Sequence, residues 1–383
     1  MPNTKTNHIS PGRHPKRLAI LMPSRSWGGI ERVIVNLINQ LSISGIQVDL
    51  LLSRDREVPY PEELNPNTNV IDLGTYHKLS AILPVARYLQ KFKPDALLTA
   101  KDHGANVGII SAELSRTNTP VFVSIHSSLS QTVTKFTRKF WVKHLYPRAN
   151  AIITVSQGAA RGLCTTFKIK PEKVHVIYNP ITNQSLFHLA NESPNHPWLL
   201  NNRSAPVILG VGRLSSSKDF PTLIKAFKKV REEMPARLLI IGEGEKREYL
   251  ENLIEELGLQ NDVDLPGFYS NPYSIMKKAD LFALSSAWEG FGNVLAEAIS
   301  LGTPAVSTNC PSGPSEILNG GLYGPLVPVG DVDSMAKAMK EVLVNPPNPE
   351  SLRKAGLRFS QENIALEYQK IMGLSPSEDE TEK

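Results

Sequence analysis

The chain has 383 residues, of which 41% are hydrophobic and 21% are charged, values typical of a globular protein with room for two or three domains. No apolar run is long enough to cross a membrane, and segment 1–16 lacks the apolar core of a signal peptide. Cys164 and Cys310 lie far apart without metal-type spacing. We therefore expect reduced thiols in a cytoplasmic protein.

Charge is unevenly distributed along the sequence. Residues 1–190 carry 23 Lys and Arg against 11 Asp and Glu, whereas residues 191–383 carry 19 against 26. Residues 114–171 contain nine Lys or Arg and no acidic residue. This asymmetry predicts that the first half meets an anionic partner, although lysines scattered over solvated faces would give the same counts.

The first half alternates short apolar runs with segments of helical periodicity. Such alternation predicts a parallel sheet covered by helices on both faces. Strands are expected at 17–22, 47–53, 70–73, 95–99, 120–125, 151–155 and 174–177. Helices are expected at 30–41, 79–92, 104–114, 135–146 and 157–167. The turn-rich loop 24–29 follows the first strand, so it should face the ligand crevice at the strand carboxyl ends.

The helix expected at 135–146 combines aromatic and basic residues. It carries Phe136, Phe140 and Trp141. A basic amphipathic helix of this kind can lie on an anionic membrane, but an ordinary packed helix with snorkelling lysines has the same composition. The basic residues that we assign to acceptor or membrane contact are Lys135, Arg138, Lys139 and Lys143.

The second half repeats the alternating pattern. Segment 183–204 is polar, with several Asn and Pro residues, and is predicted to be a linker with little structure. Strands are expected at 207–211, 237–241, 263–265, 279–284 and 304–307. Helices are expected at 219–234, capped by Asp219, and at 246–257, 293–301, 331–344 and 359–372. Segment 374–383 is acidic and is expected to be disordered.

We therefore predict an α/β protein with two Rossmann-like, doubly wound domains that face an interdomain cleft. The N-terminal domain is assigned to residues 1–190 and the second domain to residues 191–358. Residues 359–383 are expected to form a helix that packs back toward the first domain, followed by the tail. This architecture alone fits many functions.

The stretch 289–302 carries the most specific chemistry. Gly290 and Gly292 allow the backbone to approach a ligand closely, and Asn293 is expected to cap a helix that ends at Gly302. The free N–H groups of a helix start suit an anion such as a diphosphate. Glu297, four residues further along the helix, would accept hydrogen bonds from ribose hydroxyls, and Glu289 from those of a sugar. On spacing alone, a surface helix with two solvated glutamates is the simpler alternative.

An ordered set of motifs along the sequence resembles the family 4 retaining glycosyltransferases of the GT-B fold. The set comprises Gly28-Gly29 before a helix, His126 after a strand, G-V-G-R-L-S-S-S-K at 210–218, and the pair Glu289 and Glu297. The resemblance covers roughly residues 17–372. Segment 309–331 is similar to the branch that builds bacterial lipopolysaccharide cores and other surface glycans. Where this sequence has Asn179-Pro180, the family more often has Asn-Gly. This departure affects the turn that is expected between the two domains.

The resemblance implies a role for each motif. Arg213 and Lys218 would stabilise the departing diphosphate. Glu297 would hold the ribose, and Glu289 the donor sugar. His126 would contact the donor sugar from the acceptor-binding N-terminal domain, so His126 and Glu289 are the catalytic candidates. The remaining residues expected at the donor site are Gly28, Gly29, Gly267 and Phe268 near the base, Gly290, Phe291, Gly292, Asn293 and Val294. Glu316 is a further donor-site candidate.

Two Asp-x-Asp pairs fit the pattern of metal-dependent glycosyltransferases. Asp262 and Asp264 form one pair, and Asp331 and Asp333 the other. Both pairs lie at expected helix or strand boundaries, where Asp is an ordinary cap or turn former. Because Arg213 and Lys218 supply the positive charge, we predict that no metal and no other cofactor is used, the nucleotide sugar being a substrate.

The sequence thus predicts retaining transfer of a hexose or N-acetylhexosamine from a nucleotide sugar, with UDP favoured, to an anionic lipid-linked acceptor. The protein is expected in the cytoplasm, with peripheral contact to the inner face of the plasma membrane left open. A sugar-nucleotide epimerase or sugar-phosphate synthase of the same fold stays an alternative. A nucleic-acid-binding protein, suggested by the pI of about 9.0, lacks a supporting motif. A nicotinamide oxidoreductase is excluded because 210–212 and 242–244 lack a third glycine.

Overall fold

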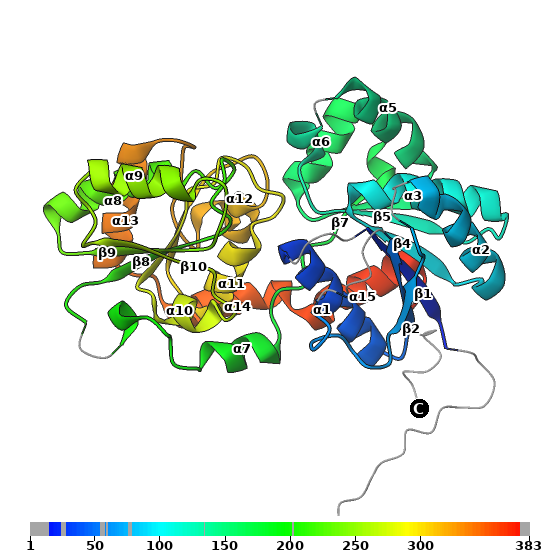
Figure 1. Ribbon diagram of the computed structural model, residues 1–383, viewed down its shortest axis with the longest axis horizontal. Helices are drawn as coiled ribbons and strands as arrows, with labels where there is room; N and C mark the ends of the chain where they lie inside the picture. Colours follow the sequence, from blue (N-terminus) through cyan, green and yellow to red (C-terminus); the bar gives the residue numbers. More distant parts are fainter. Residues whose placement is uncertain are drawn as a thin grey trace, which may run out of the picture.

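The computed structural model describes residues 15–23, 28–53, 58, 60–75, 79–133, 135–200 and 203–375. Two lobes, each built on a parallel sheet with helices on both faces, lie side by side (Figure 1). The arrangement is the predicted one of two doubly wound α/β domains. The predictions for residues 1–14, 24–27 and 376–383 lie outside the described residues.

The first lobe contains, within the described residues, a seven-stranded sheet in the order β3-β2-β1-β4-β5-β6-β7. Its strands are β1 Arg17–Pro23, β2 Gln47–Ser53, β3 Asn69–Asp72, β4 Ala96–Ala100, β5 Val121–Ile125, β6 Ala151–Thr154 and β7 Val174–Val176. Its helices are α1 Gly29–Ile43, α2 Ile82–Phe92, α3 Lys101–Ser115, α4 Leu129–Thr132, α5 Phe136–Leu145 and α6 Gln157–Phe167, with 3-10 turns at Leu79–Ala81, Tyr146–Arg148 and Pro171–Lys173. All strands and helices predicted for this half are confirmed to within a few residues.

The second lobe contains a six-stranded sheet in the order β10-β9-β8-β11-β12-β13, again within the described residues. Its strands are β8 Val207–Val211, β9 Arg237–Ile241, β10 Val263–Gly267, β11 Leu281–Leu284, β12 Ala305–Thr308 and β13 Leu326–Val327. The helices that follow the first lobe are α7 Gln184–Ala190, α8 Phe220–Glu233, α9 Arg247–Glu256, α10 Tyr273–Lys278, α11 Asn293–Leu301, α12 Pro314–Ile317, α13 Val332–Val344, α14 Pro349–Gly356 and α15 Gln361–Met372, with 3-10 turns at Pro197–Leu199, Asn319–Gly321 and Leu357–Phe359.

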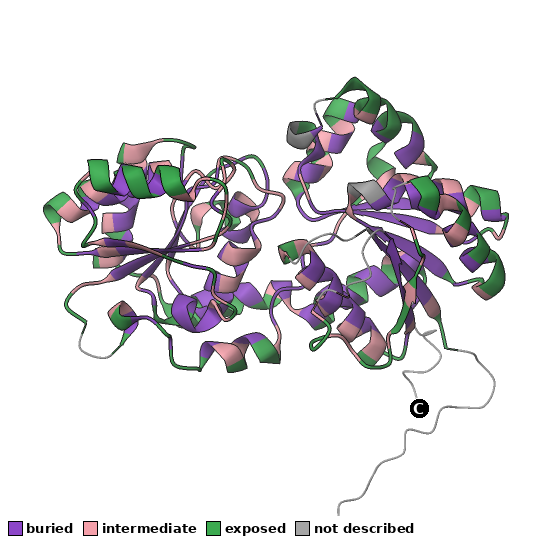
Figure 2. Ribbon diagram, viewed as in Figure 1, coloured by how far each residue is buried: buried purple, intermediate pink, exposed green. Residues whose placement is uncertain are grey.

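The apolar runs of the sequence form the cores because the central strands are covered on both faces. Residues 18–22 of β1 are all buried, and Figure 2 shows the same for the central strands of both sheets. Each fully buried Leu or Ile side chain stabilises the fold by about 1.5–3 kcal/mol. In each sheet the strand order reverses beside the first strand, between β1 and β4 and between β8 and β11. Ligands of doubly wound sheets bind at this position, outside the carboxyl ends of the strands.

The prediction of a linker with little structure at 183–204 is wrong. Asn183 caps α7 by accepting a hydrogen bond from the Leu186 N–H at 2.7 Å. Leu186, Ala190 and Leu199 are buried in a core cluster of the second lobe, and α7 packs against α10. The many Asn and Pro residues concealed these apolar contacts. The domain boundary at 190/191 stays a prediction, and this packing favours a crossing before α7.

The C-terminal helix α15 returns to the first lobe, where it packs against α1 (Figure 1). Ile364, Tyr368 and Met372 are buried in the core cluster that contains β1 and β2. The chain therefore crosses between the lobes twice. The two crossings lie together, since the Thr182 N–H donates to the Phe359 carbonyl at 2.9 Å.

No helix in the described part of the chain combines the length and the hydrophobicity that a membrane span requires.

Candidate active site

A cleft of about 490 Å³ lies between the lobes. The first lobe lines it from α1 and from the glycines before that helix, and the second lobe from the loops after β8 and β10 and from the start of α11. The predicted site residues that line the cleft are Gly28, Gly29, Arg213, Phe268, Asn293, Val294 and Glu297. Residues far apart in the sequence thus meet in one place.

The start of α11 lies in this cleft without a side-chain cap. The N-cap is Gly292, whose φ of 101° is one that residues with a side chain rarely adopt. The N–H groups of Leu295 and Ala296 bond back to the Gly292 carbonyl. Those of Asn293 and Val294 have no acceptor within the described residues, so they remain available to an anion.

The prediction that Asn293 caps α11 is wrong. Asn293 is the first residue of the helix, and its side chain turns toward the first lobe. The Asn179 amide donates to Asn293 Oδ1 at 2.7 Å, and Asn293 Nδ2 donates to the Gly29 carbonyl at 3.4 Å. Gly292 occupies the N-cap position, so the Asn293 side chain is not used as a cap. It instead connects the two lobes through these two hydrogen bonds.

Glu297 extends from α11 into the cleft. Its burial raises the pKa of the carboxyl to about 7, and the nearby positive charges of Arg32 and Lys218 act in the opposite direction. A carboxyl that titrates near neutrality is a group whose ionisation a ligand can shift.

Arg32 of α1 lines the same cleft, and no sequence motif predicted it as a site residue. Its guanidinium lies 4.3 Å from the centre of the Tyr60 ring and 3.2 Å from the Glu63 carboxylate. An arginine on an amphipathic helix looks like any solvated charge in a sequence. Its position beside Gly28-Gly29 was the one available signal.

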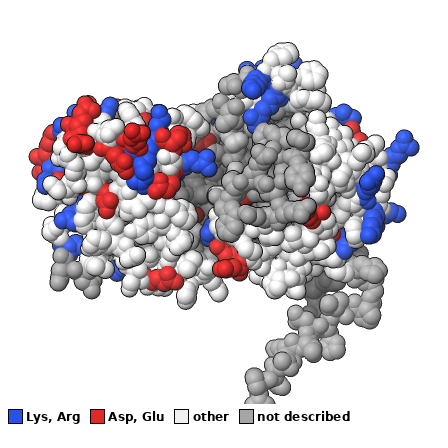
Figure 3. Space-filling model, in the orientation of Figure 1, with Lys and Arg blue, Asp and Glu red and all other residues white. Residues whose placement is uncertain are grey.

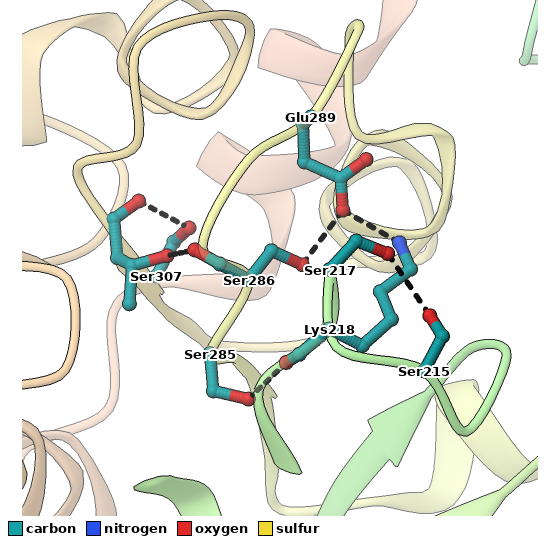
Figure 4. Close-up of polar contacts among 8 residues, drawn as sticks. Ser215, Ser217, Lys218, Ser285, Ser286, Glu289 and Ser307 are labelled. Carbon is teal, nitrogen blue, oxygen red and sulfur yellow. Dashed lines mark hydrogen bonds and ion pairs between the residues drawn. The ribbon is translucent and has the colours of Figure 1, made fainter. Parts of the chain in front are cut away.

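The two predicted cations after β8 differ in their surroundings. Arg213 lies exposed in the cleft wall, and no ion pair or hydrogen bond of its side chain occurs within the described residues. Lys218 donates from Nζ to Glu289 Oε1 at 2.5 Å, and Ser286 Oγ donates to the same oxygen at 2.7 Å (Figure 4). The predicted sugar-binding carboxylate is therefore held by the predicted phosphate-binding lysine.

Gly290 and Phe291 lie between the lobes and do not line the cleft. A Cβ at Gly290 would lie 2.2 Å from the His126 carbonyl oxygen, so only glycine fits there. Phe291 is buried, and its ring stacks 5.4 Å from that of Tyr178. Gly267 also stays outside the cleft wall, at a φ of 98° at the end of β10.

The structure buries His126, of which 8% is exposed, and does not place it in the cleft wall. Its Nε2 lies 3.0 Å from Ser124 Oγ. Burial lowers the pKa of His126 to about 4, so the ring is neutral at physiological pH. Its predicted contact with a sugar stays a prediction.

The carboxylate of Glu316 does not point into the cleft. It accepts hydrogen bonds from the backbone N–H groups of Gln157 at 2.7 Å and Gly158 at 3.1 Å, the first two residues of α6 in the other lobe. Because a carboxylate is stabilised by the positive end of a helix, we assign Glu316 to the contact between the lobes and not to the donor site.

The Asp-x-Asp pairs have structural partners. Asp331 caps α13, accepting from the Ser334 N–H at 3.0 Å, and Asp333 accepts from Lys229 at 2.5 Å. Asp262 pairs with Arg231 and Asp264 with His196, each at 3.0 Å. In the part of the chain that the structure describes, no group of three or more His, Cys, Asp or Glu side chains could hold a metal ion.

Helix α5 lies at the outer end of the first lobe (Figure 1), and none of its described residues lines the cleft. Phe136, Phe140 and Trp141 are 83%, 51% and 45% exposed. The predicted contact residues Lys135, Lys139 and Lys143 are exposed and Arg138 is partly buried. Figure 3 shows basic side chains over this end of the lobe, whereas acidic ones gather on the second lobe.

Two family descriptions match the chain. Residues 27–184 match Glycosyltransferase Family 4, and residues 194–359 match Glycosyl transferases group 1.

Two curated relatives align over most of their length. The N-acetylgalactosamine-N,N'-diacetylbacillosaminyl-diphospho-undecaprenol 4-alpha-N-acetylgalactosaminyltransferase of Campylobacter jejuni is 31% identical, over 89% of this chain and 92% of the relative. The lipopolysaccharide core biosynthesis glycosyltransferase LpsD of Rhizobium meliloti is 26% identical, over 89% and 94%.

Solved structures share the fold at lower identity. A glycosyltransferase from Rickettsia africae has a TM-score of 0.80 at 20% identity, covering 95% of this chain and 100% of its own. The Anabaena protein HepE in complex with UDP and glucose has a TM-score of 0.76 at 22% identity, covering 94% and 100%.

Proposed function

This chain belongs to glycosyltransferase family 4, and from that premise we propose that it transfers a hexose or N-acetylhexosamine from a UDP-sugar to a hydroxyl of an anionic, lipid-linked acceptor. The observation that carries the proposal is the uncapped start of α11 in the interdomain cleft. Backbone N–H groups and the guanidinium of Arg213, which have no partner among the described residues, converge there with the carboxyl of Glu297. A diphosphate with an attached ribose requires this combination of groups.

In the proposed complex the diphosphate accepts hydrogen bonds from the Asn293 and Val294 N–H groups. Arg213 approaches it from the loop after β8. Glu297, about one helical turn from the first residue of α11, accepts hydrogen bonds from the ribose hydroxyls. Gly28 and Gly29 complete the site from the first lobe.

The proposed reaction retains the configuration at the anomeric carbon. The acceptor oxygen forms a bond to that carbon on the face from which the diphosphate departs, and the leaving phosphate oxygen takes both the bonding electrons and the acceptor proton. Negative charge grows on the diphosphate during this step. Fixed cations such as Arg213 and Lys218 stabilise such charge more strongly in the transition state than in the ground state.

Glu289 is proposed to bind hydroxyls of the transferred sugar. In the structure its carboxylate already accepts from Lys218 and Ser286. Lys218 would turn from Glu289 toward the diphosphate when the nucleotide sugar binds, which leaves the carboxylate free for the sugar. The loops that carry the two residues are neighbours (Figure 4), and the proposed change is a movement of the lysine side chain.

UDP is proposed because HepE, a protein of the same fold, is described in complex with UDP and glucose. The acceptor class is proposed because the Campylobacter jejuni relative is named for a diphospho-undecaprenol acceptor. Exposed aromatic and basic side chains on α5 support contact with an anionic membrane surface, where such an acceptor resides. The ordinary packed alternative for α5 does not account for three exposed aromatic rings.

The test incubates the purified protein with single UDP-sugars, with and without a short-chain lipid diphosphate glycan, and measures the release of UDP. The proposal predicts release that depends on acceptor and a glycolipid product whose new anomeric centre has the donor's configuration by NMR. Arg213→Ala should lower kcat/KM about a hundredfold. Conversion of the UDP-sugar at the same rate without acceptor would instead indicate an epimerase or hydrolase.

A further inference from the structure

A buried chain of polar side chains runs from α15 to the start of α11. Tyr368 of α15 and Ser124 of β5 are both fully buried, and the hydroxyl of Tyr368 lies 3.2 Å from Ser124 Oγ. Ser124 Oγ lies 3.0 Å from Nε2 of His126. On the other side, the Asn179 amide donates to Asn293 at 2.7 Å, and Asn293 donates to the Gly29 carbonyl.

Two atoms in the middle of this series of hydrogen bonds have no hydrogen-bond partner within the described residues. Nδ1 of His126 and Oδ1 of Asn179 are buried and have no hydrogen bond of good geometry within the described residues. Asn179 lies close enough to the ring to raise the pKa of His126, although burial dominates and lowers it. Buried polar atoms are rarely left unpaired. When protonated, Nδ1 of His126 can donate a hydrogen bond, and Oδ1 of Asn179 can accept it.

The direction of the hydrogen bonds follows from the chemistry of the members. An asparagine amide nitrogen only donates, so Asn179 uses Nδ2 toward Asn293 and presents Oδ1 as an acceptor. A neutral imidazole carries one N–H. If that proton is on Nδ1, both orphaned atoms are satisfied, and Nε2 accepts from the Ser124 hydroxyl, which in turn accepts from Tyr368.

We propose that Tyr368, acting through Ser124, is a positioning residue that holds His126 as the Nδ1-protonated tautomer and directs this N–H to Asn179. The hydrogen-bond chain then fixes the loop after β5 relative to the start of α11. These two elements touch directly, because the His126 carbonyl leaves no room for a side chain at Gly290. The C-terminal helix thereby influences the nucleotide-sugar site without touching it. The kinetic consequence rests on the proposed function, but the tautomer does not.

The first test measures the tautomer by long-range ¹H–¹⁵N correlation of the histidine-labelled protein, with the His126 signals assigned from His126→Asn. The wild type should show the pattern of protonated Nδ1 and unprotonated Nε2. Ser124→Ala should give a mixture of tautomers, and Tyr368→Phe should move the Nε2 signal in the same direction. Tyr88→Phe is the control, because it removes a buried hydroxyl of the same lobe that bonds to Asp49. A wild type protonated on Nε2, or signals unchanged in both variants, would overturn the proposal.

The second test measures turnover of the UDP-sugar by the same variants. Tyr368→Phe should lower kcat about tenfold, as the loss of one hydrogen bond in the transition state implies, with the KM for the UDP-sugar unchanged. Tyr88→Phe should keep the wild-type kcat at a comparable loss of Tm. Equal kcat values in the two variants would contradict the positioning role. A wild type that turns over no nucleotide sugar counts against the proposed function, and the tautomer measurement still decides the inference.

Discussion

The ammonium group of Lys218 lies 2.5 Å from the carboxylate of Glu289, and this ion pair joins the loop after β8 to the loop before α11. In the proposed function the two residues bind different parts of the donor: Lys218 contacts the diphosphate, and Glu289 contacts the transferred sugar. On this proposal, the ion pair holds both side chains in place until a bound nucleotide sugar separates them.

Replacing Glu289 by Gln should separate binding of UDP from transfer of the sugar. UDP lacks the transferred sugar that Glu289 is proposed to bind, and Lys218 is released, so affinity for UDP should equal or exceed that of the wild type by calorimetry. The kcat for sugar transfer should fall about a hundredfold, as for loss of one group that stabilises the transition state. Lys218→Ala is the comparison, and it should weaken both. If Glu289→Gln loses UDP affinity to the same extent as Lys218→Ala, the assignment of Glu289 to the sugar is wrong.

The titration of Glu297 should make UDP affinity depend on pH. Burial raises the pKa of this carboxyl to about 7 in the free protein, and hydroxyl donors bind the ionised form better. Affinity should therefore rise as pH increases from 6 to 8, beyond the change caused by the phosphate itself, whose pKa is about 6. In Glu297→Gln, only the titration of the phosphate should change the UDP affinity with pH. Parallel pH profiles for the two proteins would exclude Glu297 from the site.

The Glu297 carboxyl should also make the stability of the free protein depend on pH, but stability should fall as pH rises whereas UDP affinity increases. The pKa of Glu297 is higher in the folded protein than in the unfolded chain, so the folded state binds more protons between about pH 4.5 and 7. Its stabilising contribution is complete below this window and is lost as pH rises through it. In the absence of nucleotide, the wild type should lose free energy of unfolding relative to Glu297→Gln between pH 5 and 8. Urea titrations at both pH values measure the difference.

Charge reversal at Lys139 and Lys143 should weaken binding to anionic vesicles. Both side chains are exposed on α5 beside exposed aromatic rings, and attraction to anionic lipid is worth about 1 kcal/mol per basic residue at the surface. Cosedimentation with phosphatidylglycerol vesicles should decrease strongly at low salt and less at high salt, where the charges are screened. The control reverses Lys337 and Lys354, which are exposed on the second lobe. Equal vesicle binding by the two double variants would argue against a docking role of α5.

Removal of the Glu316 carboxylate should loosen the contact between the lobes. Glu316 accepts from two N–H groups at the start of α6 in the other lobe, so Glu316→Ala should cost about 1–3 kcal/mol in the free energy of unfolding. Glu350→Ala is a matched control, since Glu350 occupies the first turn of α14 but is exposed. Calorimetry should show a lower Tm only for the Glu316 variant. Equal Tm values would mean that this contact does not hold the lobes together.

The sequence predicted the strands well because each central strand is an apolar run that must be covered on both faces, as in β1 and β2. It missed helices whose burial depends on distant partners. Helix α7 has polar neighbours in sequence, and its core contacts come from the second lobe, where it packs against α10. The short helix α10 also went undetected, since six residues give too little periodicity.

For the candidate site, local motifs predicted position better than side-chain direction. Arg213, Asn293 and Glu297 meet in the cleft as the motifs indicated. The sequence could not show that Asn293 would turn toward Asn179, nor that Glu316 would reach α6. Both contacts cross between the lobes and depend on how the two sheets are placed. Arg32 was missed for a different reason, because an arginine on an amphipathic helix resembles any solvated charge in a sequence.

A thermal-shift screen against UDP, GDP, ADP and NAD, repeated on Arg213→Ala, tests whether the interdomain cleft binds a nucleoside diphosphate. A ligand that binds only the folded protein raises Tm by mass action. We expect a rise in Tm with UDP that is largely lost in Arg213→Ala, because the guanidinium is proposed to contact the diphosphate. No shift with any nucleoside diphosphate, or a shift with NAD alone, would contradict the assignment of the interdomain cleft as a nucleotide-sugar site.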